Sequence, residues 1–224
     1  MKRTLLFVLL ICLAKSYSNA QIYGYETISP LPVQDLYDTG LMNAAINNAR
    51  EMAVRVAQIK QSVQPYRERQ YQYYSLGYYR EAIELCSNVY RQYVCYANDN
   101  KAISDMEILA GDCAMKIGAY EIAIDWYQTA KKVNVSGIDS RLSQVFESVM
   151  VEARNAYVDC NYDDLWNDVT IALKTGWESG ECYFYYGVCY EENCDYANAK
   201  KMYKLAKNKK YAPASIALQE LKRK

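Results

Sequence analysis

The sequence predicts an all-α protein, a solenoid of about four stacked helix-turn-helix repeats with an N-terminal packing helix and a C-terminal capping helix. Two observations favour this fold. Apolar residues recur at helical three-to-four spacing, and no strand-like alternation lasts long enough to compete. A tyrosine also precedes a small or apolar residue by three positions at four places, namely Tyr79 and Ala82, Tyr120 and Ala123, Tyr162 and Leu165, and Tyr196 and Ala199.

The first twenty residues have the features of a signal peptide. Lys2 and Arg3 open the chain, an apolar stretch runs over residues 5–14, and a small-x-small cleavage site ends at Ala20. A membrane-spanning anchor would need roughly 17 to 25 apolar residues, but Lys15 ends this run early. Lipid attachment at Cys12 is a further alternative. We therefore expect an exported protein, periplasmic or extracellular, with no membrane span in the mature chain.

The charge distribution disfavours nucleic acid as a partner. Cleavage removes three basic side chains and no acidic one, leaving 23 basic against 26 acidic residues, a net charge of about −3. The charge is uneven, because residues 200–224 hold nine Lys or Arg and one Glu, whereas residues 21–199 hold 14 basic and 25 acidic residues. We expect Lys200, Lys201, Lys204 and Lys207 to form the solvated face of a late helix, with docking to an anionic surface as the alternative.

The segments before the repeats are predicted from proline and from apolar spacing. Residues 21–38 contain Pro30 and Pro32 and are expected to form an extended lead-in. Residues 39–62 are expected to form the packing helix, because their apolar residues recur every three or four positions. This helix should end near Ser62, since Pro65 cannot donate a backbone hydrogen bond and restrains the residue before it.

The repeat is tested by counting from the four anchors Ala82, Ala123, Leu165 and Ala199. The residues twelve positions before the anchors are Gln70, Gly111, Ala153 and Gly187, small in three cases, as a close helix crossing requires. The residues five before, expected in the turn between helices, are Gly77, Gly118, Cys160 and Cys194. The residues four after, expected to be buried, are Cys86, Tyr127, Val169 and Tyr203.

These positions make residues 63–210 resemble tetratricopeptide repeats. The last unit is most similar, with Tyr183, Tyr186, Gly187, Tyr190, Ala199 and Tyr203 at the family's positions. The anchors are 41, 42 and 34 residues apart, and the two longer steps, with extra residues near 90–100 and 133–139, resemble the related sel-one-like repeats. Gln70 and Ala153 replace the family's Gly, and Leu165 replaces its Ala. The resemblance implies a right-handed solenoid over residues 63–224, capped by residues 213–221.

The resemblance also implies that the first helix of each pair lines a concave groove that holds a peptide or partner protein. The outward positions are Arg67, Tyr71, Tyr74, Ile108, Asp112, Met115, Met150, Arg154, Tyr157, Phe184, Val188 and Glu191. The most informative of them are the apolar or aromatic residues Ile108, Met115, Met150 and Phe184. On a solvent-facing stripe such residues are typical of a binding surface, and the alternative is that they belong to the core.

Catalysis is disfavoured, so we expect a non-catalytic binding module or scaffold. The chain has no His, no phosphate-binding Gly-rich loop and no Cys-x-x-Cys pair, and we predict no cofactor and no metal. Seven cysteines remain after cleavage, of which Cys86 and Cys113 are expected to be small core residues rather than disulfide partners. The alternative function is a structural subunit of an envelope assembly that binds through its convex or end surfaces. The partner and the oligomeric state are not predicted.

Overall fold

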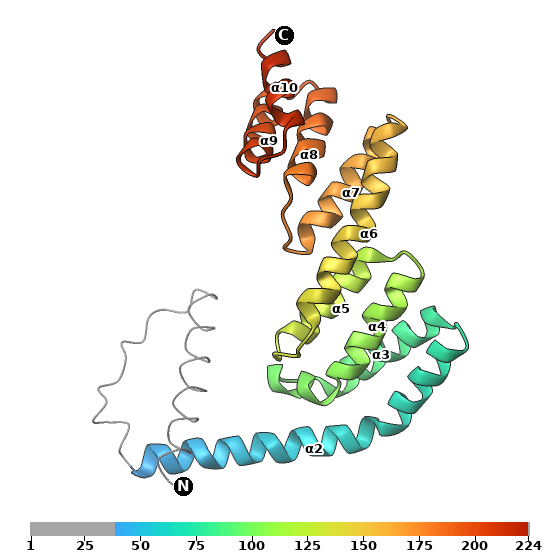
Figure 1. The fold of residues 1–224 in the computed structure, drawn as a ribbon. Helices are drawn as coiled ribbons and strands as arrows, with labels where there is room; N and C mark the ends of the chain where they lie inside the picture. Colours follow the sequence, from blue (N-terminus) through green and yellow to red (C-terminus); the bar gives the residue numbers. More distant parts are fainter. Residues whose placement is uncertain (1–38, 224) are drawn as a thin grey trace. The chain divides into compact units, whose positions relative to one another are not determined.

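A computed structural model describes the backbone of residues 39–223, so the signal peptide and the lead-in predicted over residues 1–38 lie outside the described residues. The helices, in chain order, are α2 (Thr39–Ser75), α3 (Tyr79–Tyr93), the 3-10 helix η2 (Ala97–Ala102), α4 (Ser104–Lys116), α5 (Tyr120–Lys131), α6 (Ile138–Val158), α7 (Tyr162–Lys174), α8 (Gly180–Glu192), α9 (Tyr196–Asn208) and α10 (Pro213–Glu220) (Figure 1). The described residues contain no strand, so the all-α class is confirmed. Within this part of the chain, no helix has the length and apolar character needed to cross a bilayer.

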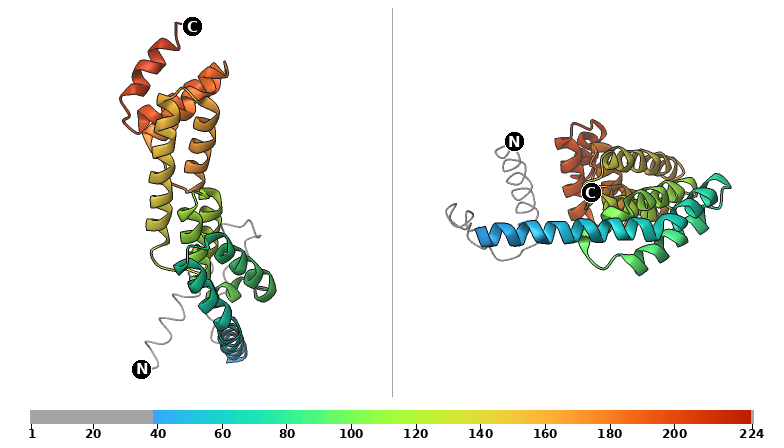
Figure 2. Two further views of the ribbon diagram at one scale, coloured as in Figure 1. Left: turned by 90° about the vertical axis from the view of Figure 1, so that its right-hand side faces the viewer. Right: turned by 90° about the horizontal axis from the view of Figure 1, so that it is seen from below.

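The chain divides into two compact units, Met1–Glu51 and Met52–Lys224, and all packing reported below lies in the second. Each helix from α3 to α9 packs against the next helix in the chain, apart from the short η2, and α9 packs against α10 (Figure 2). The end of α2 joins this series, because the rings of Tyr74 on α2 and Tyr79 on α3 have their centroids 5.7 Å apart. Consecutive antiparallel helix pairs are therefore present where the four anchors predict them.

The prediction that the first helix ends near Ser62 is wrong, because α2 continues through Pro65 to Ser75. Pro65 removes one backbone hydrogen bond, and proline is an ordinary cause of a helix bend. Figure 1 shows α2 bent in its second half. The helix persists because residues on both sides of the proline are held by burial, with Val63 and Gln70 both fully buried.

The turns within the helix pairs share one hydrogen-bonding pattern. Gly77, Gly118, Cys160 and Cys194 have φ of 80°, 69°, 56° and 59°, as expected for the residue that ends a helix in the left-handed conformation. The next residue then donates its N–H to the carbonyl five residues earlier, as from Asp195 to Tyr190 at 2.8 Å. Lys210, between α9 and α10, repeats this turn with φ of 63°. The predicted turn positions are confirmed.

Two of these turns carry a cysteine where glycine has less strain, so Cys194→Gly should stabilise the protein. The left-handed conformation costs an L-residue about 1–2 kcal/mol, more than the extra chain entropy that glycine loses on folding. Cys194 is exposed, so its side chain contributes little burial. We expect urea denaturation to show an increase of about 0.5–1 kcal/mol in the free energy of unfolding. Gly118→Ala is the matched reversal and should lower this free energy; equal stabilities for all three proteins would contradict the assignment.

In each helix pair, the size of the residue twelve positions before the anchor is matched to the size of the residue four positions after it. Ala82, Ala123, Leu165 and Ala199 are all fully buried, as predicted. A Cβ added to Gly187 would lie 2.6 Å from the Tyr203 ring, and one added to Gly111 would overlap the Tyr127 ring. In the other two pairs the ring is replaced by Val169 or Cys86, and the glycine by Ala153 or Gln70. Where the second helix has a smaller side chain than tyrosine, the first helix therefore has a larger residue than glycine.

The larger residue Gln70 is accommodated by hydrogen bonds to two helices. Its side chain is fully buried, and Nε2 donates to the carbonyl of Ala82 at 3.2 Å and to that of Met106 at 3.0 Å. These bonds satisfy the amide nitrogen, whereas Oε1 has no partner among the described residues. Gln70, which lies where two of the other helix pairs have glycine, thus links α2 to α3 and α4 by hydrogen bonds.

The extra residues of the two long steps are folded rather than looped out. Helix α6 has 21 residues against 13 in α4 and α8, and these eight additional residues equal the excess of the 42-residue step over the 34-residue one. They add two turns at the start of α6, where Ile138, Leu142 and Val145 are buried. In the 41-residue step, η2 occupies part of the added length.

Asp99 ties η2 to α2. Its carboxylate is fully buried and accepts hydrogen bonds from Arg55 Nε at 2.8 Å and Nη2 at 3.0 Å, and from the backbone N–H groups of Cys95 and Tyr96. The hydrogen bonds from Arg55 hold the pKa of Asp99 below its usual value. The Arg55 guanidinium also lies 4.8 Å from the centroid of the Tyr96 ring. The ion pair between buried Asp99 and half-exposed Arg55 thus joins the insertion to the packing helix.

Candidate partner-binding site

The twelve predicted groove residues lie on α2, α4, α6 and α8, but few of them are open to solvent. Tyr71 is 51% exposed and Tyr157 is 36% exposed, whereas Met150 and Phe184 are buried. The others are half-buried, namely Arg67, Tyr74, Ile108, Asp112, Met115, Arg154, Val188 and Glu191. The first helices therefore do not present one continuous exposed apolar stripe.

The prediction that Met150 and Phe184 face solvent is wrong. Met150 is fully buried, and Phe184 is only 8% exposed. The reason for Met150 is that α6 packs against α5, α7 and α8, so that more than one stripe of this long helix is covered. Ile108 and Met115 are half-buried and pack against the same core cluster, as the alternative interpretation held.

Three charged members of the predicted set join neighbouring helices. Arg67 Nη2 donates to the carbonyl of Ala102 at 2.9 Å and pairs with Asp105. Asp112 accepts hydrogen bonds from the Tyr127 hydroxyl at 2.6 Å and from Arg141 Nε at 3.1 Å. Glu191 likewise accepts a hydrogen bond from the Tyr203 hydroxyl at 2.6 Å. These side chains stabilise the fold, which leaves them less available to a partner.

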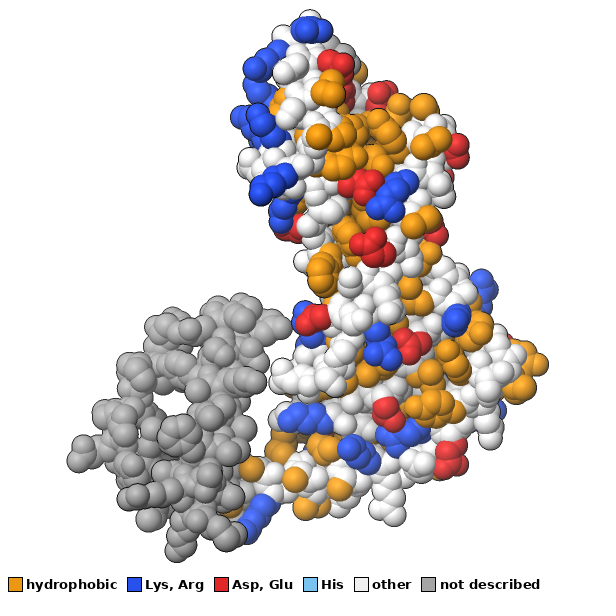
Figure 3. Space-filling view, viewed as in Figure 1, with side chains coloured by type: hydrophobic (Ala, Val, Ile, Leu, Met, Phe, Trp, Pro, Cys, Tyr) orange, Lys and Arg blue, Asp and Glu red, His pale blue; other side chains and the backbone are white. Residues whose placement is uncertain are grey.

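The structure brings Arg154, Tyr157 and Phe184 together with residues that the sequence did not indicate. We call this group the aromatic site and define it as Arg154, Tyr157, Glu181, Phe184, Tyr185 and Tyr211. The Tyr157 ring centroid lies 4.9 Å from that of Tyr185 and 6.1 Å from that of Phe184, and Phe184 lies 5.3 Å from Tyr211. Figure 3 shows hydrophobic side chains gathered over α8 and the end of α6.

An ion pair holds the aromatic site rigid. Arg154 donates from Nε to Glu181 Oε1 at 2.9 Å and from Nη2 to Oε2 at 2.7 Å, and the Tyr185 hydroxyl donates to Oε1 at 3.1 Å. The hydrogen bonds from Arg154 lower the pKa of Glu181, whereas burial raises the pKa of Tyr185. At neutral pH the site thus offers a neutral Tyr185 phenol and a charged pair. It suits stacking and hydrogen bonding rather than proton transfer.

The three residues of the site that were missed had only weak signals in the sequence. Glu181 and Tyr185 are four residues apart and share one face of α8, which is a spacing shared by many structural pairs. Tyr211 follows Lys210, which has the same left-handed conformation as the turn residues of the four helix pairs. Applying the turn pattern once more after α9 would have placed Tyr211 beside the last helix pair. Its contact with Phe184 depends on how α8 and α9 cross.

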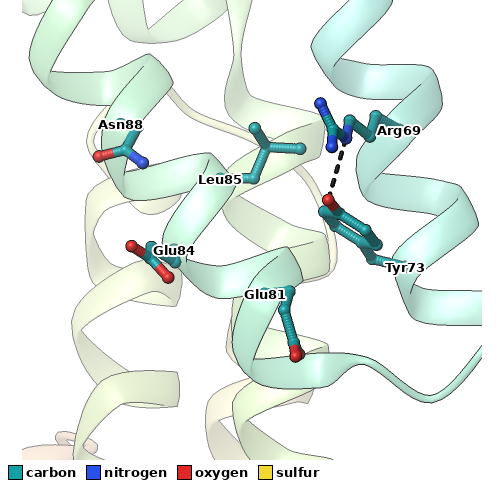
Figure 4. Close-up of a pocket in the computed structure, with 6 residues that line it drawn as sticks. All are labelled: Arg69, Tyr73, Glu81, Glu84, Leu85 and Asn88. Atoms are coloured by element: carbon teal, nitrogen blue, oxygen red, sulfur yellow. Dashed lines mark hydrogen bonds between the residues drawn. The ribbon is translucent and has the colours of Figure 1, made fainter.

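Two open hollows lie elsewhere on the surface. One has a volume of about 260 Å³ and lies between α2 and α3, where Arg69 Nε donates to the Tyr73 hydroxyl at 3.0 Å and the carboxylates of Glu81 and Glu84 lie across from it (Figure 4). The other has a volume of about 600 Å³ and is lined by Arg80, Ile83, Glu84, Ser87, Arg91, Ile117, Gly118, Ala119 and Ile122. Most of these side chains are exposed, so neither hollow gathers buried polar groups around a reacting atom.

The seven cysteine thiols of the described residues are unpaired, and several of them are buried. Cys86 and Cys113 are among the buried ones, as predicted. Burial raises the pKa of Cys182 and of Cys189 to about 12, which keeps both thiols protonated and unreactive. Across residues 42–223 no three His, Cys, Asp or Glu side chains are placed to hold a metal ion together.

No model of a known protein family matches this chain, and no curated protein is similar to it.

Proposed function

We propose that the protein is an exported, non-catalytic helical-repeat protein of the tetratricopeptide type that holds a segment of a partner protein at the aromatic site. The helix pairs would stack as a right-handed solenoid, and α10 would cap its last pair. The repeat positions, the shared turns and the packing of consecutive helices support this architecture. Of the twelve groove residues predicted from the sequence, the proposed binding site keeps only Arg154, Tyr157 and Phe184.

The observation that carries the proposal is an exposed tyrosine on a rigid aromatic base. Tyr157 is 36% exposed, while Phe184 and Tyr185, which its ring contacts, are buried. A ring held in this way loses little conformational entropy when a partner covers it. Tyrosine and arginine are also the residue types most enriched in binding hot spots.

The same geometry indicates the chemistry of the bound segment. The fork to Glu181 uses Nε and Nη2 of Arg154, whose side chain is 42% exposed, so Nη1 can donate to a carbonyl of an extended segment. The Tyr157 ring can stack on an apolar or planar side chain one or two residues away. We therefore expect a segment with an aromatic or large aliphatic anchor.

Tyr157→Ala should abolish most of this binding without unfolding the protein. We expect a photocrosslinking amino acid at position 158, next to Tyr157 and 76% exposed, to label a defined segment of one partner in the source cell. Calorimetry with that purified partner should then show about 30-fold weaker binding for Tyr157→Ala, the effect of losing a hot spot of about 2 kcal/mol. Arg154→Ala should also weaken binding. Part of that effect would be indirect, because Arg154 positions Glu181, which in turn accepts a hydrogen bond from Tyr185.

Tyr71→Ala is the matched control, because Tyr71 is an exposed tyrosine at the other end of the predicted groove. It should leave the affinity unchanged. A Tyr71 variant that weakens binding as much as the Tyr157 variant would show that binding is not confined to the aromatic site. An unchanged affinity for Tyr157→Ala would overturn the proposal. Phe184 is unsuitable for this test because its ring belongs to the core.

A further inference from the structure

The exposed side of α9 carries a row of lysines on a surface separate from the aromatic site. Lys200, Lys201, Lys204 and Lys207 are all exposed, and we call these four residues the lysine stripe. Their spacing places them on one face of the helix, since residues three, four and seven apart lie above one another. Figure 3 shows Lys and Arg side chains along the edge of the molecule formed by α9 and α10.

The stripe is held in place by the opposite face of the same helix. Ala199, Tyr203 and Ala206 are buried, and α9 packs closely against α8. The Asp195 side chain caps the helix by accepting the backbone N–H of Asn198 at 3.1 Å. The four lysines are therefore fixed relative to one another at their Cα atoms, and only their flexible side chains move.

Few acidic groups neutralise this surface. Within the described residues, none of the stripe lysines has a carboxylate oxygen within 4.0 Å of Nζ, and Lys201 donates instead to the amide oxygen of Asn198 at 3.1 Å. The nearby pair of Lys209 with Glu178, at 3.1 Å, involves a residue outside the stripe. Residues 147–195 hold eleven acidic and two basic residues, and residues 196–224 hold nine basic and one acidic. The positive charge is thus concentrated on this one end segment.

We propose that the lysine stripe docks the protein on the surface of a bilayer that contains anionic lipid. Lysine is a compact, hydrated charge that suits phosphate headgroups without fixed geometry, whereas arginine is the residue preferred for forked recognition. Seven of the eight basic residues between 200 and 223 are lysine. Leu205, 39% exposed, adjoins the stripe on α9, and Ile216, 61% exposed, lies on α10. An exposed apolar side chain among lysines, such as Leu205, is typical of peripheral membrane surfaces.

Two other anionic partners fit the surface less well. Nucleic acid is disfavoured because the mature chain is acidic overall, with 23 basic against 26 acidic residues. An acidic protein would be expected to place an anchor side chain in a pocket, and neither of the two hollows described above is lined by residues of α9. A bilayer needs only a broad positive surface and a few apolar contacts.

Binding to vesicles tests the proposal with the full chain. Vesicles of phosphatidylglycerol mixed with phosphatidylcholine should sediment the protein, and vesicles of phosphatidylcholine alone should sediment much less. The triple variant K200Q/K204Q/K207Q should bind the anionic vesicles about 100-fold more weakly, since each lysine near an anionic surface contributes about fivefold. Added salt should weaken the wild type in the same direction, because exposed charges are screened.

The control variant is K60Q/K101Q/K116Q, which removes the same charge from exposed lysines on α2, η2 and α4. It should bind like the wild type, and K200R/K204R/K207R should retain binding. Residues 1–38 are present in every arm, so binding through them affects all proteins alike. Equal loss in the control, equal sedimentation with neutral vesicles, or tighter binding to duplex DNA than to vesicles would overturn the proposal. Salt-sensitive self-association that the K200Q/K204Q/K207Q variant abolishes, without vesicle binding, would assign the stripe to a second copy instead.

Discussion

Glu107→Gln should raise the free energy of unfolding by about 3 kcal/mol at pH 7 and leave it almost unchanged at pH 4.5. Glu107 lies in α4 and is fully buried, and neither of its carboxylate oxygens has a hydrogen-bond partner among the described residues. Burial raises its pKa from 4.5 to about 8, and the nearby charge of Asp105 adds to the shift, which Lys132 opposes. Folding therefore favours the protonated acid.

The sign of the pH dependence follows from this raised pKa. In the unfolded chain Glu107 loses its proton near pH 4.5, whereas in the folded chain it keeps the proton until about pH 8. The stability that the neutral acid allows is thus fully present below pH 4.5 and is lost progressively as the pH rises to about 8. Glutamine has nearly the same shape and never ionises, so it removes this loss.

Urea denaturation of both proteins between pH 4.5 and 8.5 measures the effect. Glu147→Gln is the control, because Glu147 is an exposed carboxylate on α6 and should show no such difference. If Glu107→Gln were no more stable than the wild type at pH 8, the carboxyl group would have to be solvated or paired. A gain of equal size at pH 4.5 would show that charge is not the cause.

Gly111→Ala should destabilise the protein by about 2 kcal/mol, and much of this loss should disappear when Tyr127 is also replaced by Val. The added methyl group would overlap the Tyr127 ring, which is buried and is held by the hydrogen bond from its hydroxyl to Asp112. Overpacking of this kind costs about 1–3 kcal/mol, and the better helix propensity of alanine offsets only about 1 kcal/mol. The chain already uses the double replacement in its third helix pair, where Ala153 and Val169 occupy the equivalent positions.

A double-mutant cycle of Gly111→Ala and Tyr127→Val, measured by chemical denaturation, provides the test. Tyr127→Val alone should cost about 3 kcal/mol through the lost ring. The double variant should be at least about 1 kcal/mol more stable than the sum of the two losses predicts. Gly187 and Tyr203 offer an independent repeat of the cycle. Additive losses, within about 0.5 kcal/mol, would mean that the ring moves aside and that matched side-chain size does not explain the pattern.

The helix pairs were predictable because their signals are local. A residue that leaves the helical region, such as Gly118 or Cys194, ends a helix through its own backbone and the few residues around it. Burial of the anchors, such as Ala123, follows from the same periodicity. The end of α2 was not predictable, since the cost of Pro65 is local but the burial of Val63 and Gln70 that outweighs it comes from distant helices.

The candidate site was predictable only in part. Tyr157 on α6 and Phe184 on α8 do meet, and Arg154 on α6 bonds to Glu181 on α8, so the predicted first helices do come together here. The exposure of these side chains could not be read from spacing, since two added turns lengthen α6 and it contacts three other helices. Glu107 was missed for a similar reason. One acid among the apolar residues of α4 resembles a solvated position until the packing of its neighbours is known.

The packing of each helix against its neighbours in the chain also affects how the protein folds and how it opens locally. Each helix from α3 to α10 contacts mainly its neighbours in the chain, so few native contacts require distant segments to find each other. Low sequence separation between contacting residues favours fast folding, which can begin at any helix pair and spread in both directions. The same property lets the outermost pair open while the centre stays closed. Hydrogen exchange should therefore be slowest in the middle helices and should quicken by steps toward α10.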